Sequence, residues 1–188
     1  MSYGFLINVY DPGILFPDGT YQIKPAKYKG DLHYDPPFMP PYHYGDHPEN
    51  KMGLKSLRPY DVLIFHTTLK DEHESNRYII GGFYVKETVL VGNMNEQELM
   101  DYQNNPHVDK GDLTATIYKA ETLFFDKYRF YLEKPLLFTT NLADILKLKV
   151  KWNQKHTPYQ QIAWATRAVR KIDNNTLNLL HNYWRTYG

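Results

Sequence analysis

Short apolar runs separated by turn residues predict β-strands in the first 140 residues of the chain. The first run is dense, β-branched and stopped by Asp11-Pro12-Gly13, which predicts a buried strand that ends in a turn. Later runs come in two pairs with short connections, and each pair predicts a hairpin. The strands, which we expect to pair mostly antiparallel, are predicted at residues 3–10, 61–69, 77–92, 115–126 and 129–138.

Two local signals stand in the middle of the chain. Gly81 and Gly82 interrupt the third expected strand. Because glycine weakens a strand interior, the pair predicts a β-bulge or a close approach by another segment. Further on, Asn95 and Glu98 have the spacing of a capping box and predict a short helix that ends near residue 105.

The last third of the chain changes to helical spacing. Thr157, Pro158 and Gln160 supply an N-cap, an N1 proline and a capping box, so we expect a helix over residues 157–173. A shorter helix is expected at residues 141–148. Apolar residues recur on single helix faces, which predicts packing on the sheet; they are Ile162, Ala165, Val169 and Ile172, then Leu177, Leu180, Trp184 and Tyr187.

These elements predict one α+β domain over residues 1–188, with a sheet-rich core at 1–140 and a helical part at 141–188 packed on it. Apolar residues make up 42% of the chain, which is enough for a real core. The absence of cysteine excludes disulfides and thiolate chemistry. No signal-peptide pattern or long apolar run occurs, so we expect a soluble cytoplasmic protein with no membrane partner.

Residues 32–48 form a long segment rich in proline, aromatic, imidazole and carboxylate groups. A loop of this length inside a compact domain is usually functional. Its histidines and aspartates are of the types that bind metals, but none of the dense zinc spacings occurs, so we expect no metal and no cofactor. For acid–base catalysis the candidate residues are Asp11, His33, Asp35 and Asp46.

Basic residues, without any acidic residue, are spread from residue 145 to residue 172. A solvated helix face is the ordinary interpretation of such a stretch. The net charge is only +1, so any surface for nucleic acid must be a local patch. Here aromatic residues are interspersed among the basic ones. A surface that binds single-stranded nucleic acid needs both types, because basic side chains neutralise phosphates and aromatic rings stack on bases. The expected phosphate-binding residues are Lys149, Lys151, Lys155, Arg167, Arg170 and Lys171.

An ordered series of motifs resembles one known family. Between about residues 5 and 90 the series runs LINVYD, DGTYQIKP, HYDPPFMPPYHYGD, LRPYDVLIFHTTL and RYIIGGFYV. It is similar to the nucleotide-modification-associated domain of the third type, a PUA-like family related to EVE, YTH and ASCH domains. The resemblance implies a curved, mostly antiparallel sheet or small barrel with flanking helices, and an association with modified nucleotides or DNA in modification and defence systems.

The resemblance also selects individual residues. The chain departs from the family at Tyr60, where glycine is usual, and at Gly82, where an aromatic residue is usual. The ring missing at Gly82 could open a pocket or alter its ligand. The residues that match the family pattern are Asp11, Asp18, Gly19, His33, Asp35, Pro36, Phe38, Tyr44, Gly45, Asp46, Asp61 and Gly81.

Three functions are consistent with these features. The one we favour is a non-catalytic domain that binds modified nucleobases in DNA or RNA, with the loop over one mouth of the sheet. The alternatives are an enzyme acting on a nucleotide or nucleic acid through acidic and histidine residues, and a protein-interaction module. The expected nucleobase-binding residues are Asp35, Phe38, Tyr44, Asp46, His66 and Trp164.

Overall fold

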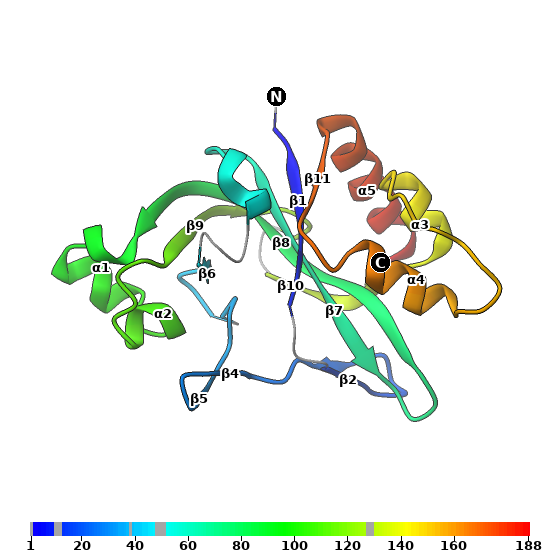
Figure 1. Cartoon of the computed structure of the whole chain (residues 1–188), viewed down its shortest axis with the longest axis horizontal. Coiled ribbons are helices and arrows are strands. Elements are labelled where there is room, and N and C mark those ends of the chain that lie inside the picture. Colours follow the sequence, from blue (N-terminus) through cyan, green and yellow to red (C-terminus); the bar gives the residue numbers. More distant parts are fainter. Residues whose placement is uncertain (1, 10–12, 38, 48–51, 127–129) are drawn as a thin grey trace.

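The computed structural model describes residues 2–9, 13–37, 39–47, 52–126 and 130–188 (Figure 1). Of the residues named individually above, Asp11, Pro12 and Phe38 lie outside these ranges. Asp11 and Phe38 are candidate site residues.

A mixed sheet of nine strands forms the body of the protein. Its strands run in the order β11-β1-β7-β8-β9-β6; β10 lies beside β8, and β2 and β3 extend from β7. They are β1 (Gly4–Asn8), β2 (Gly13–Leu15), β3 (Tyr21–Gln22), β6 (His43–Asp46), β7 (Val62–Lys70), β8 (Ser75–Leu90), β9 (Thr116–Leu123), β10 (Tyr131–Leu137) and β11 (Arg170–Ile172).

The remaining elements surround this sheet. A separate two-stranded hairpin consists of β4 (Ala26–Tyr28) and β5 (Asp31–His33). None of the helices within the described ranges is long and apolar enough to cross a membrane. The helices are η1 (Met52–Ser56), η2 (Val91–Asn93), α1 (Glu96–Asp101), α2 (Pro106–Asp109), α3 (Thr140–Ile145), α4 (Pro158–Ala165) and α5 (Asn174–Tyr187).

Most strand pairs are antiparallel, as the sequence predicts, but β1 and β2 both lie parallel to β7. The sheet is open, because the strand order ends at β11 on one side and β6 on the other among the described residues. The α+β class is therefore confirmed. The barrel form of the expectation is wrong, since the two end strands do not pair with each other.

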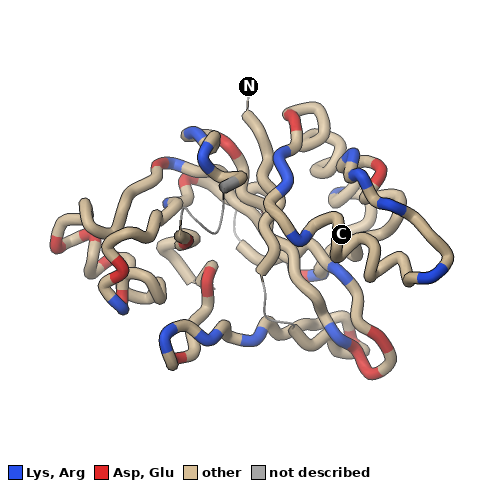
Figure 2. Tube along the Cα trace, viewed as in Figure 1, with Lys and Arg blue, Asp and Glu red and all other residues tan. Residues whose placement is uncertain are grey.

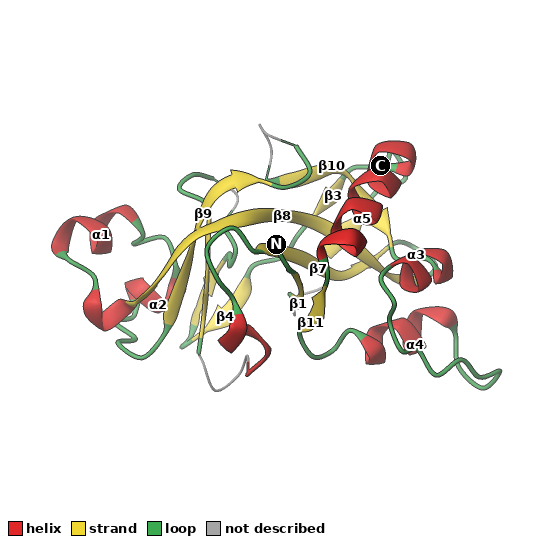
Figure 3. Ribbon diagram, turned by 90° about the horizontal axis from the view of Figure 1, so that it is seen from above, coloured by secondary structure: helices red, strands yellow, loops and turns green. Residues whose placement is uncertain are grey.

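Strand β8 connects the two halves of the sheet (Figure 3). Its first half pairs with β7 and β10, and its second half pairs with β9. The register with β7 shifts between Phe65 and His66, so Ile80 is the extra residue of a β-bulge. A Cβ added to Gly81 would lie 2.3 Å from the Phe130 carbonyl oxygen. Both the bulge and the close approach that the glycine pair predicts are therefore present.

The sheet separates two hydrophobic cores. On one face, Val62 and Ile64 of β7 pack in a core that includes residues of α3, α4 and α5. On the other face, Leu63 and Phe65 pack in a second core with Tyr44 of β6. The alternation follows from the two-residue period of a strand. The helical part therefore covers one face, and the residue 32–48 segment contributes to the other.

The C-terminal third is helical only in part. The capping box of Thr157 and Gln160 forms as predicted, but α4 ends at Ala165. The expectation of a helix through residue 173 is wrong, because Arg170–Ile172 forms β11 and pairs antiparallel with β1. Without β11 this edge of β1 would present unpaired backbone groups. The pairing also places Ile172 in the core of the helix-covered face. The helical spacing of the apolar residues does not indicate that residues 170–172 pair with the edge of β1.

Tyr60 has a left-handed backbone conformation, with φ of 69°. Its side chain is 62% exposed, and its amide donates a 2.7 Å hydrogen bond to the Val85 carbonyl. A left-handed conformation costs a residue with a Cβ about 1–2 kcal/mol, whereas glycine adopts it freely. This conformation accounts for the usual glycine of the motif at this position.

We expect Tyr60→Gly to raise the free energy of unfolding by about 1 kcal/mol, because it removes this strain. Denaturant unfolding measures the change. Tyr60→Ala is the matched control: it removes the ring but keeps the Cβ, so its stability should stay near that of the parent chain. Equal effects of the two variants would contradict the assignment to backbone strain.

We expect Gly81→Ala to lower the free energy of unfolding by about 3 kcal/mol, because the new methyl group would overlap a backbone oxygen that cannot rotate away. Thermal unfolding followed by circular dichroism measures the loss. A variant as stable as the parent would show that β8 and residue 130 separate at little cost.

Candidate functional site

A hollow of about 400 Å³ lies where the end of β1, hairpin strand β4, strand β6 and helix α2 meet. In Figure 1 these elements lie to the left of the helical part. Another hollow of about 400 Å³ lies beside the β7–β8 turn, but its charged lining residues are exposed or half-exposed. The first hollow, which we call the β6 pocket, is lined by Asn8, Val9, Ala26, Lys27, Tyr28, Asp35, Tyr44, Gly45, Asp46, His47, Pro106 and His107.

The carboxylates of the pocket are held by short-range hydrogen bonds. The amide of Gly45 donates to both carboxylate oxygens of Asp35, at 3.1 and 3.2 Å. The hydroxyl of Tyr44 donates to Asp46 at 2.8 Å. Burial of Tyr44, together with the charge of Asp46, raises the pKa of the phenol well above its usual value, so it stays a donor at neutral pH. Both carboxylates therefore have fixed positions.

Gly45 allows β6 to lie against the start of α2. A Cβ at this position would lie 2.7 Å from the Asn105 side-chain oxygen and 2.7 Å from a ring carbon of His107. Asn105 caps α2 through the His107 amide at 2.9 Å. The glycine of the YGD motif thus brings the loop aspartates and the α2 histidine to one pocket.

Asn8 contributes an unused acceptor. The residue is 7% exposed and lines the β6 pocket, and its side-chain oxygen has no hydrogen-bond partner within the described part of the chain. A buried acceptor without a partner is costly in a folded protein. This oxygen is therefore available to a donor that enters the pocket.

A cluster of polar side chains centres on Asp112, at one wall of the pocket. One carboxylate oxygen accepts from the Tyr28 hydroxyl at 2.5 Å, and lies 2.6 Å from His47 Nε2 and 3.2 Å from His107 Nδ1. Thr114 donates to the other oxygen at 3.2 Å. Burial opposes ionisation of Asp112, but the bonds from Tyr28 and His107 outweigh it and lower its pKa. Asp112 is thus a carboxylate at neutral pH.

Burial also lowers the pKa of His107 and so favours the neutral ring. The hydrogen bond to Asp112 and its charge act in the opposite direction, but burial is the larger effect. His107 is 7% exposed, and the side chain of His47 is 32% exposed. The wall of the pocket therefore combines one carboxylate with two imidazoles that differ in their contact with water.

The structure brings together three of the residues expected from the sequence: Asp35, Tyr44 and Asp46 line the same pocket. Two further loop histidines are elsewhere. His33 lies with Asp35 beside a much smaller hollow. His43 is fully buried, and burial lowers its pKa to about 4, so it stays neutral. Its Nδ1 lies 2.6 Å from the Pro41 carbonyl oxygen.

His66 and Trp164 are not part of the β6 pocket. His66 is fully buried and contacts the ring of Phe138 edge-on, in the core on the helix-covered face of the sheet. Trp164 is 56% exposed on α4, where its ring contacts His156 at a centroid distance of 4.6 Å. Because β6 and α4 lie on opposite sides of the central strands in Figure 1, Trp164 and the pocket form separate surfaces.

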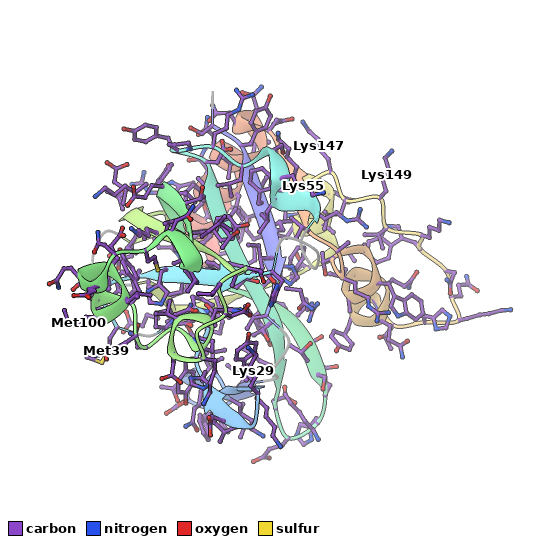
Figure 4. The ribbon with its side chains drawn as sticks, turned by 60° about the vertical axis from the view of Figure 1, so that its left-hand side comes forward. Lys29, Met39, Lys55, Met100, Lys147 and Lys149 are labelled. Atoms are coloured by element: carbon purple, nitrogen blue, oxygen red, sulfur yellow. The ribbon has the colours of Figure 1, made fainter. Side chains whose placement is uncertain are left out.

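The basic stretch at residues 145–172 also lies apart from the β6 pocket. Figure 2 shows lysines and arginines along the chain between α3 and β11, away from β6. Lys147 and Lys149 project outward on the side away from Met39 and Met100 (Figure 4). Lys171 stacks over the Tyr3 ring at 3.8 Å, and Arg170 donates to the Ala165 carbonyl at 2.6 Å. All six expected phosphate-binding residues are exposed, including Arg170 and Lys171.

Sequence reasoning missed four pocket or cluster residues: Asn8, Tyr28, His107 and Asp112. Asn8 ends an apolar strand, and the others lie in short polar segments that carry no motif. Their meeting depends on contacts between segments more than 80 residues apart, such as Tyr28 with Asp112. The one local signal was Asn105-Pro106, which marks the start of α2 rather than only the end of α1.

Comparison with known proteins gives one match. No curated protein and no solved structure matches the chain significantly. The family model described as nucleotide modification associated domain 3 matches residues 14–185, which include the loop, the sheet apart from β1 and the start of β2, and nearly all of the C-terminal helical part. The match extends beyond the motifs that carry the resemblance in the sequence. The chain therefore belongs to the nucleotide modification associated domain 3 family.

Proposed function

We propose that this domain binds the base of a modified nucleotide in the β6 pocket. The observation that carries the proposal is the convergence of the acceptors Asn8, Asp35 and Asp46 on one hollow. Its volume of about 400 Å³ lies within the range of small-ligand sites. Membership in a family associated with nucleotide modification supports the same ligand class.

The acceptors favour a base that presents N–H groups. An amide oxygen accepts one or two hydrogen bonds and a carboxylate has about four lone-pair sites, so Asn8, Asp35 and Asp46 are all groups that accept from N–H donors. Adenine, cytosine and guanine carry exocyclic amino groups, whereas thymine carries a single ring N–H. The rings of Tyr28 and His107 line the same pocket and offer packing surface to the base.

Phosphate contacts divide into two groups in this proposal. Lys27 is exposed and lines the pocket, so it is placed to contact the phosphate of the bound nucleotide. The basic stretch lies at the other end of the molecule (Figure 2). We assign its exposed lysines to other phosphates of a polymer, as a sequence-independent contact.

An enzyme acting on the bound nucleotide is the second candidate. It is favoured by the 2.6 Å contact between Asp112 and the partly exposed His47 at the pocket wall. A carboxylate that orients a histidine is a recurring general-base arrangement. The protein-interaction module is not proposed, because it predicts the absence of a concave pocket.

We expect the purified chain to bind dAMP, dCMP or dGMP, or a modified form of one of them, more tightly than dTMP. Asp46→Asn should weaken that binding about 10- to 100-fold, because it removes a charged acceptor while keeping the side-chain shape. Titration calorimetry with a panel of plain and modified nucleotides measures both effects.

Asp101→Asn is the control for this experiment, since Asp101 is an exposed carboxylate on α1 outside the pocket. It should bind as the parent chain does. Failure of every nucleotide to bind would refute the pocket assignment. Turnover that stops in His47→Gln while binding persists would select the enzyme.

For single-stranded oligonucleotides we expect log affinity to fall with log salt concentration. Alanine at Lys149, Lys151 and Lys155 should reduce the steepness of that slope by about 2, because each phosphate contact contributes about 0.7 on a single strand. Fluorescence anisotropy at several salt concentrations measures the slope. Alanine at Lys55, Lys86 and Lys134 removes the same charge from other exposed positions and should change it less. Equal reductions of the slope in the two triple variants would show that the basic stretch contributes only non-specific positive charge.

A further inference from the structure

The cluster around Asp112 has a composition that nucleotide binding does not require. His47 directly follows β6, His107 lies on α2 and Asp112 lies shortly after α2, and their ligand atoms lie within 4.8 Å of one another. We infer that these three side chains form a binding site for a divalent transition metal ion at the wall of the β6 pocket.

The donor set is that of a metal site with open positions. Two imidazole nitrogens and one carboxylate oxygen suit zinc or ferrous iron, whereas magnesium and calcium prefer oxygen donors. Ligand atoms about 2.0–2.2 Å from a common ion lie roughly 3–3.6 Å apart. The observed separations from Asp112 are 2.6 Å to His47 and 3.2 Å to His107, and all three ligand atoms lie within 4.8 Å of one another, so the side chains must shift to surround an ion.

Neighbouring groups hold the ligands in orientations that a metal uses. Thr114 Oγ1 lies 3.4 Å from Nδ1 of His47, whereas Nε2 is the ring nitrogen 2.6 Å from Asp112, and the same hydroxyl donates to the second oxygen of Asp112. A proton on Nδ1 leaves Nε2 of His47 free to bind an ion. Tyr28 supports Asp112 through its hydroxyl. Such outer partners fix the tautomer and the carboxylate direction at metal sites.

The position of the cluster gives the ion a role beyond stability. His47 and His107 line the β6 pocket, whereas Asp112 lies behind them. An ion held by three protein ligands on this wall has at least one coordination position left for water or a ligand in the pocket. The inference concerns the metal alone and does not depend on nucleotide binding.

From the sequence we expect no metal, and the residues of metal-binding type in the 32–48 segment are its own histidines and aspartates. The proposed site uses one of them, His47, with two residues from a segment about 60 positions later. No spacing motif reports this combination, because the ligands meet only when β6 packs beside α2.

The test is metal binding by the full chain after removal of metals with a chelator. We expect one equivalent each of zinc and cobalt(II) to bind, or of iron(II) under anaerobic conditions, and no magnesium at the same concentration. Cobalt(II) absorption in the visible region reports nitrogen and oxygen ligation directly. His47→Gln, His107→Gln and Asp112→Asn should each weaken binding at least about 100-fold, because even loss of an outer partner costs 10- to 100-fold.

His73→Gln is the control, since His73 is exposed on the β7–β8 turn and lies outside the cluster. It should bind metal as the parent chain does. If Asp112→Asn fails to fold, His47→Gln still decides, because His47 is the most exposed ligand. The inference would be overturned if the parent chain bound no metal, or if the ligand variants bound it as well as His73→Gln does. The cluster around Asp112 would then have only a structural role, as a set of hydrogen bonds between segments.

Discussion

The close approach at Gly81 is the constraint on which the rest of the structure depends. Strand β8 serves both halves of the sheet, and its bulge at Ile80 interrupts the pairing with β7 shortly before the pairing with β9 begins at Phe83. Backbone from residue 130 covers the glycine so closely that a side chain has no space. Because β9 pairs with β8 and carries β6, the position of the loop aspartates follows from this contact. The β6 side of the pocket is thus attached to the rest of the sheet through β9.

Local signals predicted local features well. The capping boxes at Asn95 and Thr157 form as their spacing requires, and the glycine pair marks a real bulge. The motif series led to the correct family, and three of its loop and strand residues meet at one pocket. What the sequence missed depends on distant pairings. Strand β11 forms by pairing with the edge of β1, which is distant in sequence. Asp112 contacts Tyr28, His47 and His107, which come from three separate segments.

Base binding and metal binding would use neighbouring groups of one pocket. Asp35 and Asp46 would hold the edge of a base, and the two histidines with Asp112 would hold an ion. Negative charge from three aspartates attracts a cation and repels free phosphate, so the pocket alone is better suited to a base than to a phosphate group. A bound divalent ion would reverse that balance locally. Metal loading and nucleotide affinity would then be coupled through charge.

The hairpin of β4 and β5 has a dynamic consequence. Among the residues that the structure describes, it shares no backbone pairing with the main sheet. Tyr28 and Asp31 instead join it to Asp112 and Lys110, which follow α2 directly. Elements tied by a few side-chain contacts open locally at lower free energy than the sheet, and contiguous ones open as a unit. Amide exchange in residues 26–33 and 105–112 would therefore share one opening event, and whatever binds Asp112 would slow both segments together.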